Sequence, residues 1–154
     1  MTVTYVRYWG SNFKRPRHSN YFAGIMRSVV DAGWESYLVC SHPPVDSQLA
    51  DAVLQTGTKI VYLPRAKGNF DMGCIWRVYR LCKHLNCHIM HCDNMHTSPL
   101  IGAALAGVPI RLWSKHSMNR VYEDGGRKTL RDRIAISTRL SSRLATRILA
   151  QQCG

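Results

Sequence analysis

The stretch HIMHCDNMHTSPLIGAALAGVPIRLWS, residues 88–114, contains a complete strand–helix–strand unit. His88–Cys92 is a short, mostly apolar run that is typical of a buried strand. Pro99–Ala106 is rich in Ala and Leu and ends at Gly107, which is typical of a helix with a proline in its first turn and a glycine after its end. Ile110–Ser114 again has the composition of a strand. Because a helical crossover joins parallel strands, this unit predicts a parallel sheet covered by helices.

The same alternation continues toward both ends of the chain. Further strands are expected at residues 3–8, 36–40 and 59–63. Further helices are expected from Ser19 or Asn20 to Gly33, around Leu49–Leu54, over Asp71–Leu85 and over Thr129–Ala145, and Thr97 or Ser98 is expected to cap the helix at 99–106. The pattern indicates one Rossmann-like domain over residues 1–154, with three α/β/α layers and a mainly parallel sheet. Ligands of such sheets bind beyond the carboxyl ends of the strands, so the loops there should carry the function.

The composition favours a folded protein with anionic partners. A hydrophobic content of 45% in 154 residues is enough to bury a core, which excludes a disordered tail or a mini-protein. The formal net charge of +12 favours nucleotide phosphates, anionic lipid head groups or nucleic acid. The first eight residues precede a basic loop, the wrong order for a secretory signal, and no apolar run is long enough to span a membrane. We expect a cytoplasmic protein that is soluble or peripheral at the inner face of the membrane.

The six cysteines contain no close CxxC pair, and reduced thiols are expected. They are Cys40, Cys74, Cys82, Cys87, Cys92 and Cys153. A structural zinc site built from Cys82, Cys87, His88, His91 and Cys92 is an alternative, since these residues are close in sequence. However, His88 and Cys92 fall in a predicted strand, where alternation sends side chains to opposite faces. Buried thiols fit better, and neither a metal nor a cofactor is expected.

Four segments occur in an order that points to one enzyme family. They are HCDNMH at 91–96, AALAGVPIR at 103–111, KHS at 115–117 and RLATRILA at 143–150. This succession resembles the N-terminal domain of family 4 retaining glycosyltransferases, in particular exopolysaccharide-type members. That domain has a strand ending in His, an Ala-rich helix, a Gly-Val-Pro turn, a strand ending in a Ser/His pattern, and a helix and strand before the interdomain region. The resemblance covers most of the chain.

The resemblance implies the N-terminal half of a GT-B fold, in which two Rossmann-like domains face each other across a cleft. The first domain recognises mainly the acceptor and the second mainly the nucleotide-sugar. Because the sequence ends at Gly154, without a donor-binding domain, we expect a piece of a longer enzyme, a split enzyme or a truncated product with little turnover alone. The implied parent reaction moves a hexose to a polysaccharide or lipid-linked glycan with retention and without metal, the leaving phosphate serving as the base.

His116 is the candidate catalytic residue, because it follows the predicted strand at 110–114 where the family places a histidine that contacts sugar or phosphate. A neutral imidazole can donate to a sugar hydroxyl, and a charged one can offset phosphate charge. Ser117 and Asn119 are candidates to orient it or to contact the acceptor. The alternative is a loop histidine bonded to the backbone. Ser114 stands where exopolysaccharide-type members commonly have a second histidine.

The loop after the first predicted strand replaces the Gly-Gly turn that family members often have. Its candidate substrate-binding residues are Gly10, Ser11, Asn12, Lys14, Arg15, Arg17 and His18. Its cations can replace backbone amides near a phosphate or an acidic sugar, next to the N-terminus of the following helix. A merely solvated basic loop is the alternative.

The loop after the strand at 88–92 supplies Asp93, Asn94 and His96 as further candidate substrate-binding residues. Asp93 can accept a proton from an acceptor hydroxyl if it faces the cleft, although the family relies on no protein carboxylate as the base. His96 is the more exposed candidate for acceptor contact. His91 alternates with Cys92 and is open to a packed position beneath the cleft.

Two other groups of residues have a structural and a functional interpretation. The last predicted helix has seven cations within residues 127–147 and an apolar side formed by Leu130, Ile134, Leu140 and Leu144. Its basic side can be solvated or can lie on anionic lipid. The tryptophans, at 9, 34, 76 and 113, are expected to anchor the core, with Trp9 alone at a strand end where a sugar ring can stack.

Two functions of different classes follow. The leading hypothesis is a glycosyltransferase N-terminal domain with a nucleotide-sugar and a glycan acceptor as ligands, peripheral membrane contact and no nucleic acid. The alternative is a non-catalytic basic Rossmann-like domain that binds nucleic acid or phosphate ligands, although no aromatic residues are interleaved with the cations. A dinucleotide-dependent oxidoreductase is disfavoured because no GxGxxG turn follows the first strand. Surface that a second domain would cover can also lead to self-association.

Overall fold

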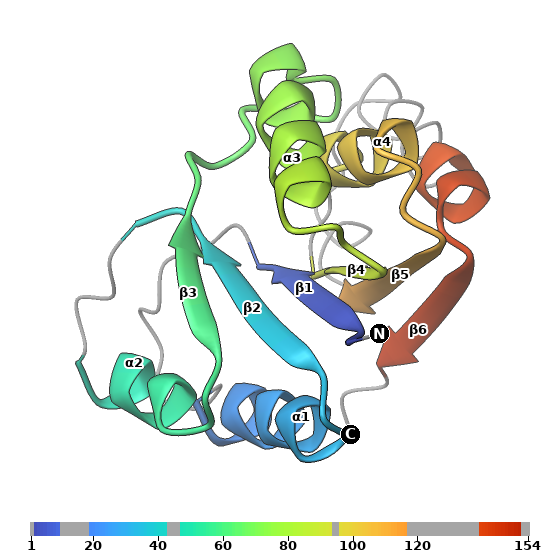
Figure 1. The fold of residues 1–154 in the computed structure, drawn as a ribbon. Coiled ribbons are helices and arrows are strands. Elements are labelled where there is room, and N and C mark those ends of the chain that lie inside the picture. The colour runs from blue at the N-terminus through green and yellow to red at the C-terminus, as the bar shows by residue number, and fades with distance from the viewer. Residues whose placement is uncertain (1, 10–18, 43–46, 94–95, 117–138, 152–154) are drawn as a thin grey trace.

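The structure is a computed structural model, and it describes residues 2–9, 19–42, 47–93, 96–116 and 139–151. These residues form a sheet of six parallel strands (Figure 1). The strands are β1 (Thr4–Tyr8), β2 (Glu35–Cys40), β3 (Lys59–Tyr62), β4 (Ile89–Cys92), β5 (Ile110–His116) and β6 (Arg147–Gln151). Their order in the sheet is β3-β2-β1-β4-β5-β6. The predicted Rossmann-like α/β fold is therefore confirmed.

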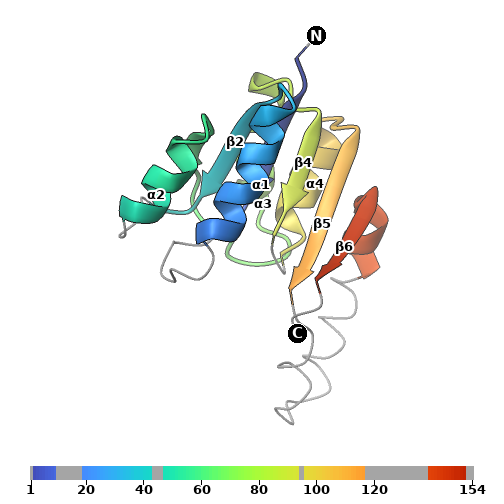
Figure 2. The same cartoon turned by 90° about the horizontal axis from the view of Figure 1, so that it is seen from below.

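Helices cover both faces of this sheet and make three layers (Figure 1). One face carries α1 (Ser19–Asp31) and α2 (Ser47–Leu54), and the other carries α3 (Met72–His84) and α4 (Ser98–Leu105). Residues 139–144, the described part of the last predicted helix, are helical and lie on the same face as α3 and α4. Figure 2 shows the side of the sheet that carries α1, with this helix in front of the strands.

Helix α3 shows how the local sequence sets an element. Asp71 precedes it, and the Asp71 carboxylate accepts a hydrogen bond of 3.0 Å from the backbone N–H of Cys74, which caps the helix. Ile75 and Val78, together with the two cysteines of the helix, are buried at helical spacing against the sheet. The predicted helix over Asp71–Leu85 is confirmed, with those two residues as its caps.

The start of α4 differs from the expected cap. Thr97 occupies the capping position, but its side chain makes no capping hydrogen bond and its backbone is helical, with φ −77° and ψ −24°. Its hydroxyl lies 2.9 Å from that of Ser141, while the Ser98 hydroxyl donates to the carbonyl of Gly68. Both hydroxyls connect separate segments, so neither is used within the helix. The expected end of this helix is confirmed, because Gly107 has a φ of +77° that a glycine adopts without strain.

The two faces of the sheet have separate cores. Val6, Tyr8 and Met90 belong to the cluster beneath α3 and α4, whereas Tyr5 and Leu38 belong to the one beneath α1 and α2. Alternation along each strand produces this division. The described thiols, Cys40, Cys74, Cys82, Cys87 and Cys92, are free and buried, as expected, and Cys153 lies outside the described residues.

The expectation that tryptophans anchor the core is wrong for one of them. Trp113 is buried and Trp34 packs against the core beneath α1, but the Trp76 side chain is 60% exposed. Trp76 lies on the solvent side of α3, since the opposite side of that helix packs against the sheet.

No helix among the residues that the structure describes is both long enough and apolar enough to cross a bilayer.

Candidate functional site

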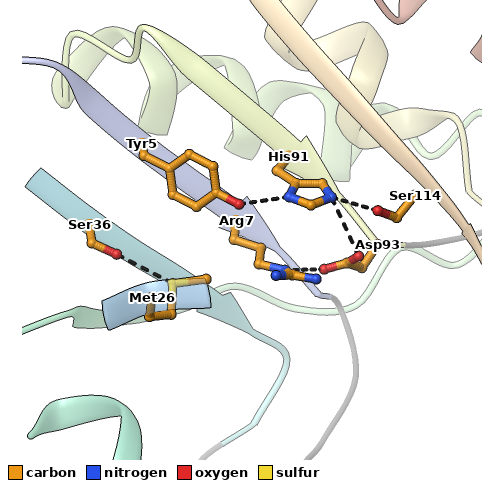
Figure 3. Close-up of polar contacts among 7 residues, drawn as sticks. All are labelled: Tyr5, Arg7, Met26, Ser36, His91, Asp93 and Ser114. Atoms are coloured by element: carbon orange, nitrogen blue, oxygen red, sulfur yellow. Dashed lines mark hydrogen bonds and ion pairs between the residues drawn. The ribbon is translucent and has the colours of Figure 1, made fainter. Parts of the chain in front are cut away.

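Five polar side chains from neighbouring strands gather on the α1 face of the sheet (Figure 3). We call Tyr5, Arg7, His91, Asp93 and Ser114 the polar cluster. In each strand these residues occupy alternate positions, and the residues between them, such as Val6 and Cys92, face the other core. Register then aligns the strands, because Arg7 pairs with His91 and His91 pairs with Leu112. The cluster therefore follows from alternation combined with strand order.

His91 is buried at the centre of the cluster, with a hydroxyl at each ring nitrogen. Nδ1 lies 2.6 Å from the Tyr5 hydroxyl and Nε2 lies 2.7 Å from Ser114 Oγ. Nε2 also lies 3.6 Å from Asp93 Oδ1. Hydroxyls both donate and accept, so they satisfy the ring whichever nitrogen carries the proton. The imidazole is thus held in one orientation between β1 and β5.

Arg7 and Asp93 form an ion pair whose two side chains are fully buried. The guanidinium Nε donates to Asp93 Oδ2, and the guanidinium carbon lies 4.5 Å from the centre of the Phe22 ring on α1. Phe22 in turn packs against Trp9, with 4.5 Å between ring centres. Buried charges are costly unless they are paired and hydrogen-bonded, so the pair is a constraint on how β1, β4 and α1 fit together.

The polar cluster coincides with the switch point of the sheet. The chain order runs outward from β1 through β2 to β3 on one side, and through β4 to β6 on the other. The helices after β1 and β2 cover one face, and those after β3 and β4 cover the other (Figure 1). Ligands of open α/β sheets bind where the order reverses, beyond the strand ends. Arg7 and Asp93 join the two strands at that point.

A second group of polar residues lies in the loops after β3 and β4. His96 is half-buried, and its pKa is lowered by burial and then by the nearby Arg65 guanidinium, with Asp71 acting in the opposite direction. Asp71 also ties the two loops together, because its backbone N–H donates to Ser98 Oγ at 2.9 Å. A lowered pKa keeps the His96 imidazole neutral at neutral pH, so it can donate one hydrogen bond and accept another.

The structure places three of the predicted site residues. Asp93 follows β4 as expected, but the Arg7 guanidinium pairs with its carboxylate. His96 is in the loop after β4. His116 was expected just past the strand, which is wrong: β5 extends to His116, which pairs with Gln151 of β6. Pairing with β6 extends β5 by two residues beyond its expected end at Ser114.

The other predicted site residues lie outside the residues that the structure describes. They are Gly10, Ser11, Asn12, Lys14, Arg15, Arg17 and His18 in the loop after β1, Asn94 in the loop after β4, and Ser117 and Asn119 after β5. All three segments adjoin strands whose ends carry the polar cluster. Their roles therefore stay predictions.

The sequence interpretation missed Arg7, Tyr5 and the role of Ser114. The available signal was spacing: Tyr5 and Arg7 stand two residues apart in one strand, as do His91 and Asp93 at the end of another. Polar residues at a spacing of two in otherwise apolar strands indicate a polar face. Recognising the contact also required knowing that β1 and β4 are neighbours, which no single strand shows.

The buried thiols are unsuited to nucleophilic chemistry. Burial raises the pKa of Cys40 to about 12, and burial together with the nearby Asp93 raises that of Cys92 well above its ordinary value. A thiol must ionise to act as a nucleophile or a metal ligand, so these groups stay protonated at neutral pH. Within the described ranges, no three His, Cys, Asp or Glu side chains are placed to share a metal ion.

Comparison with known proteins gives one finding. Residues 18–151 match the family described as Glycosyltransferase Family 4, so the match extends over more than half of the chain. The matched range includes strands β2 to β6 and helices α1 to α4. Comparison with curated proteins gave no match.

Proposed function

The chain belongs to glycosyltransferase family 4, and we propose that it is the acceptor-side domain of an enzyme that transfers a hexose from a nucleotide-sugar to a polysaccharide or lipid-linked glycan, with retention. The single observation that carries this proposal is the family match over residues 18–151. The position of the polar cluster supports it, since Arg7 and Asp93 join the two strands at the switch point of the sheet.

In this proposal the polar cluster is a rigid support beneath the binding loops. Arg7 and Asp93 fix the ends of β1 and β4 to each other, and His91 fixes them to Ser114 of β5. Positioning of reacting groups is a large part of enzymatic rate enhancement, and small displacements are costly. Side chains that are themselves locked by packing and hydrogen bonds provide such positioning.

The Arg7–Asp93 pair also supports a mechanism without a carboxylate base. A general base must have a lone pair available to the proton that it removes. Asp93 is buried and its carboxylate is engaged with a guanidinium, so it is better suited to holding the loop than to proton transfer. We therefore assign proton acceptance to the leaving phosphate of the donor.

Two histidines have proposed roles at the ends of the strands. His116, at the end of β5, would hydrogen-bond a hydroxyl of the donor sugar. His96, whose pKa is lowered by burial, would contact an acceptor hydroxyl as a donor or acceptor. Lys14, Arg15 and Arg17 would bind an anionic group of the acceptor.

Calorimetric titration across a range of salt concentrations tests this proposal. Nucleoside diphosphates, nucleotide-sugars, short glycans and a control oligonucleotide would be titrated into the purified chain. We expect glycan binding that weakens in His96→Ala and in the Arg15→Gln/Arg17→Gln variant, whereas His116→Ala should weaken the binding of the nucleotide-sugar. The exposed Arg27→Gln, on α1, is the matched charge control and should bind like the wild type.

The same titration distinguishes the competing function. A basic domain that binds nucleic acid would bind the oligonucleotide tightly, with an affinity that falls steeply as salt is raised. Such binding, without any glycan binding, would replace the proposed function.

A further inference from the structure

The solvent side of α3 carries an apolar stripe that no other described segment covers. Met72 is 73% exposed and Trp76 is 60% exposed, and Phe70, which lies just before the helix, is 59% exposed. The Trp76 ring stacks on Tyr79, with ring centres 5.2 Å apart and an interplanar angle of 16°. Large apolar side chains scattered singly are common on protein surfaces, but a contiguous group marks an interaction site.

The spacing of these residues sets them in one line along the helix. Met72, Trp76, Tyr79 and Lys83 follow each other at intervals of four, three and four residues, which places them on one side of an α-helix. The buried Ile75, Val78 and Cys82 lie on an adjacent side of the helix, about a quarter of a turn away, and pack against the sheet. Packing within the described domain explains this inner side and part of the Tyr79 side chain, which also contacts the inner core. It does not explain the exposed Met72 and Trp76.

Cations border the stripe, and the one nearby carboxylate is already engaged. Arg80 and Lys83 are exposed on the helix, and Arg65 and Lys67 are exposed in the loop before it. The only acid between residues 64 and 86 is Asp71, whose carboxylate accepts hydrogen bonds from the backbone N–H groups of Lys67 and Cys74. A surface with exposed aromatic rings and a positive border is complementary to an anionic, partly apolar partner.

We propose that the outer side of α3 docks this domain on an anionic lipid surface. Trp and Tyr rings favour the interface between head groups and acyl chains, where Met72 and Phe70 would insert. Arg80 and Lys83 would pair with lipid phosphates, their alkyl stems lying along the apolar layer.

The cations disfavour a second copy of the chain as the occupant. A symmetric dimer through this stripe would bring the same residues of both copies together, because a two-fold interface is self-complementary. Arg80 and Lys83 of each copy would then meet a surface that carries the same cations. The stripe offers no carboxylate to pair with them. A lipid surface supplies the negative charge that the helix lacks.

Membrane docking goes beyond the proposed glycosyl transfer and stands on separate residues. Nevertheless, the start of α3 adjoins the loop that carries His96, since Asp71 bonds Ser98 and influences the His96 pKa. A membrane lying on α3 would therefore be close to the proposed acceptor side. The transfer reaction can fail without affecting docking, and the reverse also holds if the acceptor is a free polysaccharide.

Sedimentation of the chain with vesicles tests docking without any sugar ligand. One set of vesicles would be phosphatidylcholine alone, and the other would contain about three parts in ten of phosphatidylglycerol. We expect binding to the anionic set only, weakened about tenfold by Trp76→Ala and about fivefold by each of Arg80→Gln and Lys83→Gln. Leu105→Ala removes an exposed apolar side chain from α4 and is the matched control, expected to leave binding unchanged.

Circular dichroism would verify that each variant keeps the helical content of the wild type. Equal vesicle binding by the wild type and Trp76→Ala would overturn the proposal. So would self-association that Trp76→Ala abolishes, because a second copy would then occupy the stripe. Binding of a duplex oligonucleotide that is lost in Arg80→Gln, without vesicle binding, would assign the surface to nucleic acid instead.

Discussion

The two faces of the central strands differ sharply although neighbouring residues build them. In β1, Val6 and Tyr8 point into the core beneath α3 and α4, while Tyr5 and Arg7 point toward α1 and join the polar cluster. In β4, Met90 and Cys92 face the first core, and His91 faces the second. One face is built from apolar contacts, which tolerate substitutions of similar volume, whereas the other adds to its apolar core a set of polar side chains that depend on specific partners.

This difference separates residues that stabilise the fold from residues that organise a site. Burying charge adds little or no net stability compared with apolar residues of the same shape, so a buried ion pair is weak evidence of a stabilising role. Within the polar cluster, Arg7, His91 and Asp93 lie at or next to the carboxyl ends of β1 and β4, the two strands at the switch point. Its position thus fits the organisation of a site better than the stabilisation of the fold.

The largest expected effect comes from breaking the ion pair on the polar face. Asp93→Asn leaves the Arg7 guanidinium buried without its carboxylate, and should lower the free energy of unfolding by about 3–5 kcal/mol. Urea denaturation measures this change. The double variant Arg7→Leu/Asp93→Leu should lose much less than the sum of its single variants. Additive losses would show that the two side chains do not act as a pair.

The next largest effect is expected on the apolar face, where α3 and α4 lie in close contact. A Cβ on Gly102 would lie 2.6 Å from the backbone oxygen of Ile75, so Gly102→Ala must push α4 away from α3. We expect a loss of about 1–3 kcal/mol. Gly24→Ala, in α1 with no atom within 4 Å of the new Cβ, is the control and should gain up to about 1 kcal/mol. Thermal unfolding would compare them, and equal melting temperatures would contradict the predicted clash.

A smaller effect compares two tyrosines of the same strand. Tyr5→Phe removes the hydroxyl at 2.6 Å from His91 Nδ1 and leaves a buried ring nitrogen without that partner, at a cost of about 1–2 kcal/mol. Tyr8→Phe removes a hydroxyl that lies 3.6 Å from the Cys74 sulfur, a weak partner, and should cost about half as much. Chemical denaturation of both variants measures the two losses in the free energy of unfolding. A larger loss for Tyr8→Phe than for Tyr5→Phe would contradict this prediction.

The smallest expected effect is a pH dependence of stability that comes from Asp71, the residue that caps α3. Hydrogen bonds from the backbone N–H groups of Lys67 and Cys74 lower the pKa of Asp71 below its ordinary value. A depressed carboxyl pKa contributes stability above the unfolded pKa, and this contribution is lost as the pH falls through the folded pKa. Asp71→Asn keeps a capping oxygen but not the charge, so the wild type should be the more stable protein near pH 6. The difference should shrink as the pH falls below about 4, the ordinary carboxyl pKa, and vanish once the folded carboxyl is also protonated. Denaturation curves of both proteins, measured from near pH 6 downward, check this. A stability difference that stays constant with pH would contradict the prediction.

Much of the fold could be predicted because strands and helices carry local signals. The capping Asp71, the buried spacing of α3 and the glycine after α4 all lie within a few residues of what they determine. The six-stranded order and the length of β5 could not be predicted in the same way. His116 is in a strand only because β6, more than thirty residues later, pairs with it.

The candidate site was less predictable than the fold. His96 and Asp93 were identified from loop position, but Arg65, which lowers the His96 pKa, and Arg7, which pairs with Asp93, come from other segments of the chain. Arg7 looks like any residue of an exposed strand until β4 and α1 enclose it. The exposure of Trp76 was missed for the opposite reason, since a large aromatic ring usually indicates a core.

The most direct test of the central claim is an amide chemical-shift map of the chain titrated with short glycans, and in parallel with an oligonucleotide. If the polar cluster supports an acceptor site, glycans should shift the amides at the ends of β1, β4 and β5, including Asp93, His96 and His116. Amides at the opposite ends of these strands, such as Thr4 and Ile110, should not move. Glycans that shift no amide, together with an oligonucleotide that shifts the same strand ends, would contradict the claim and assign the site to nucleic acid.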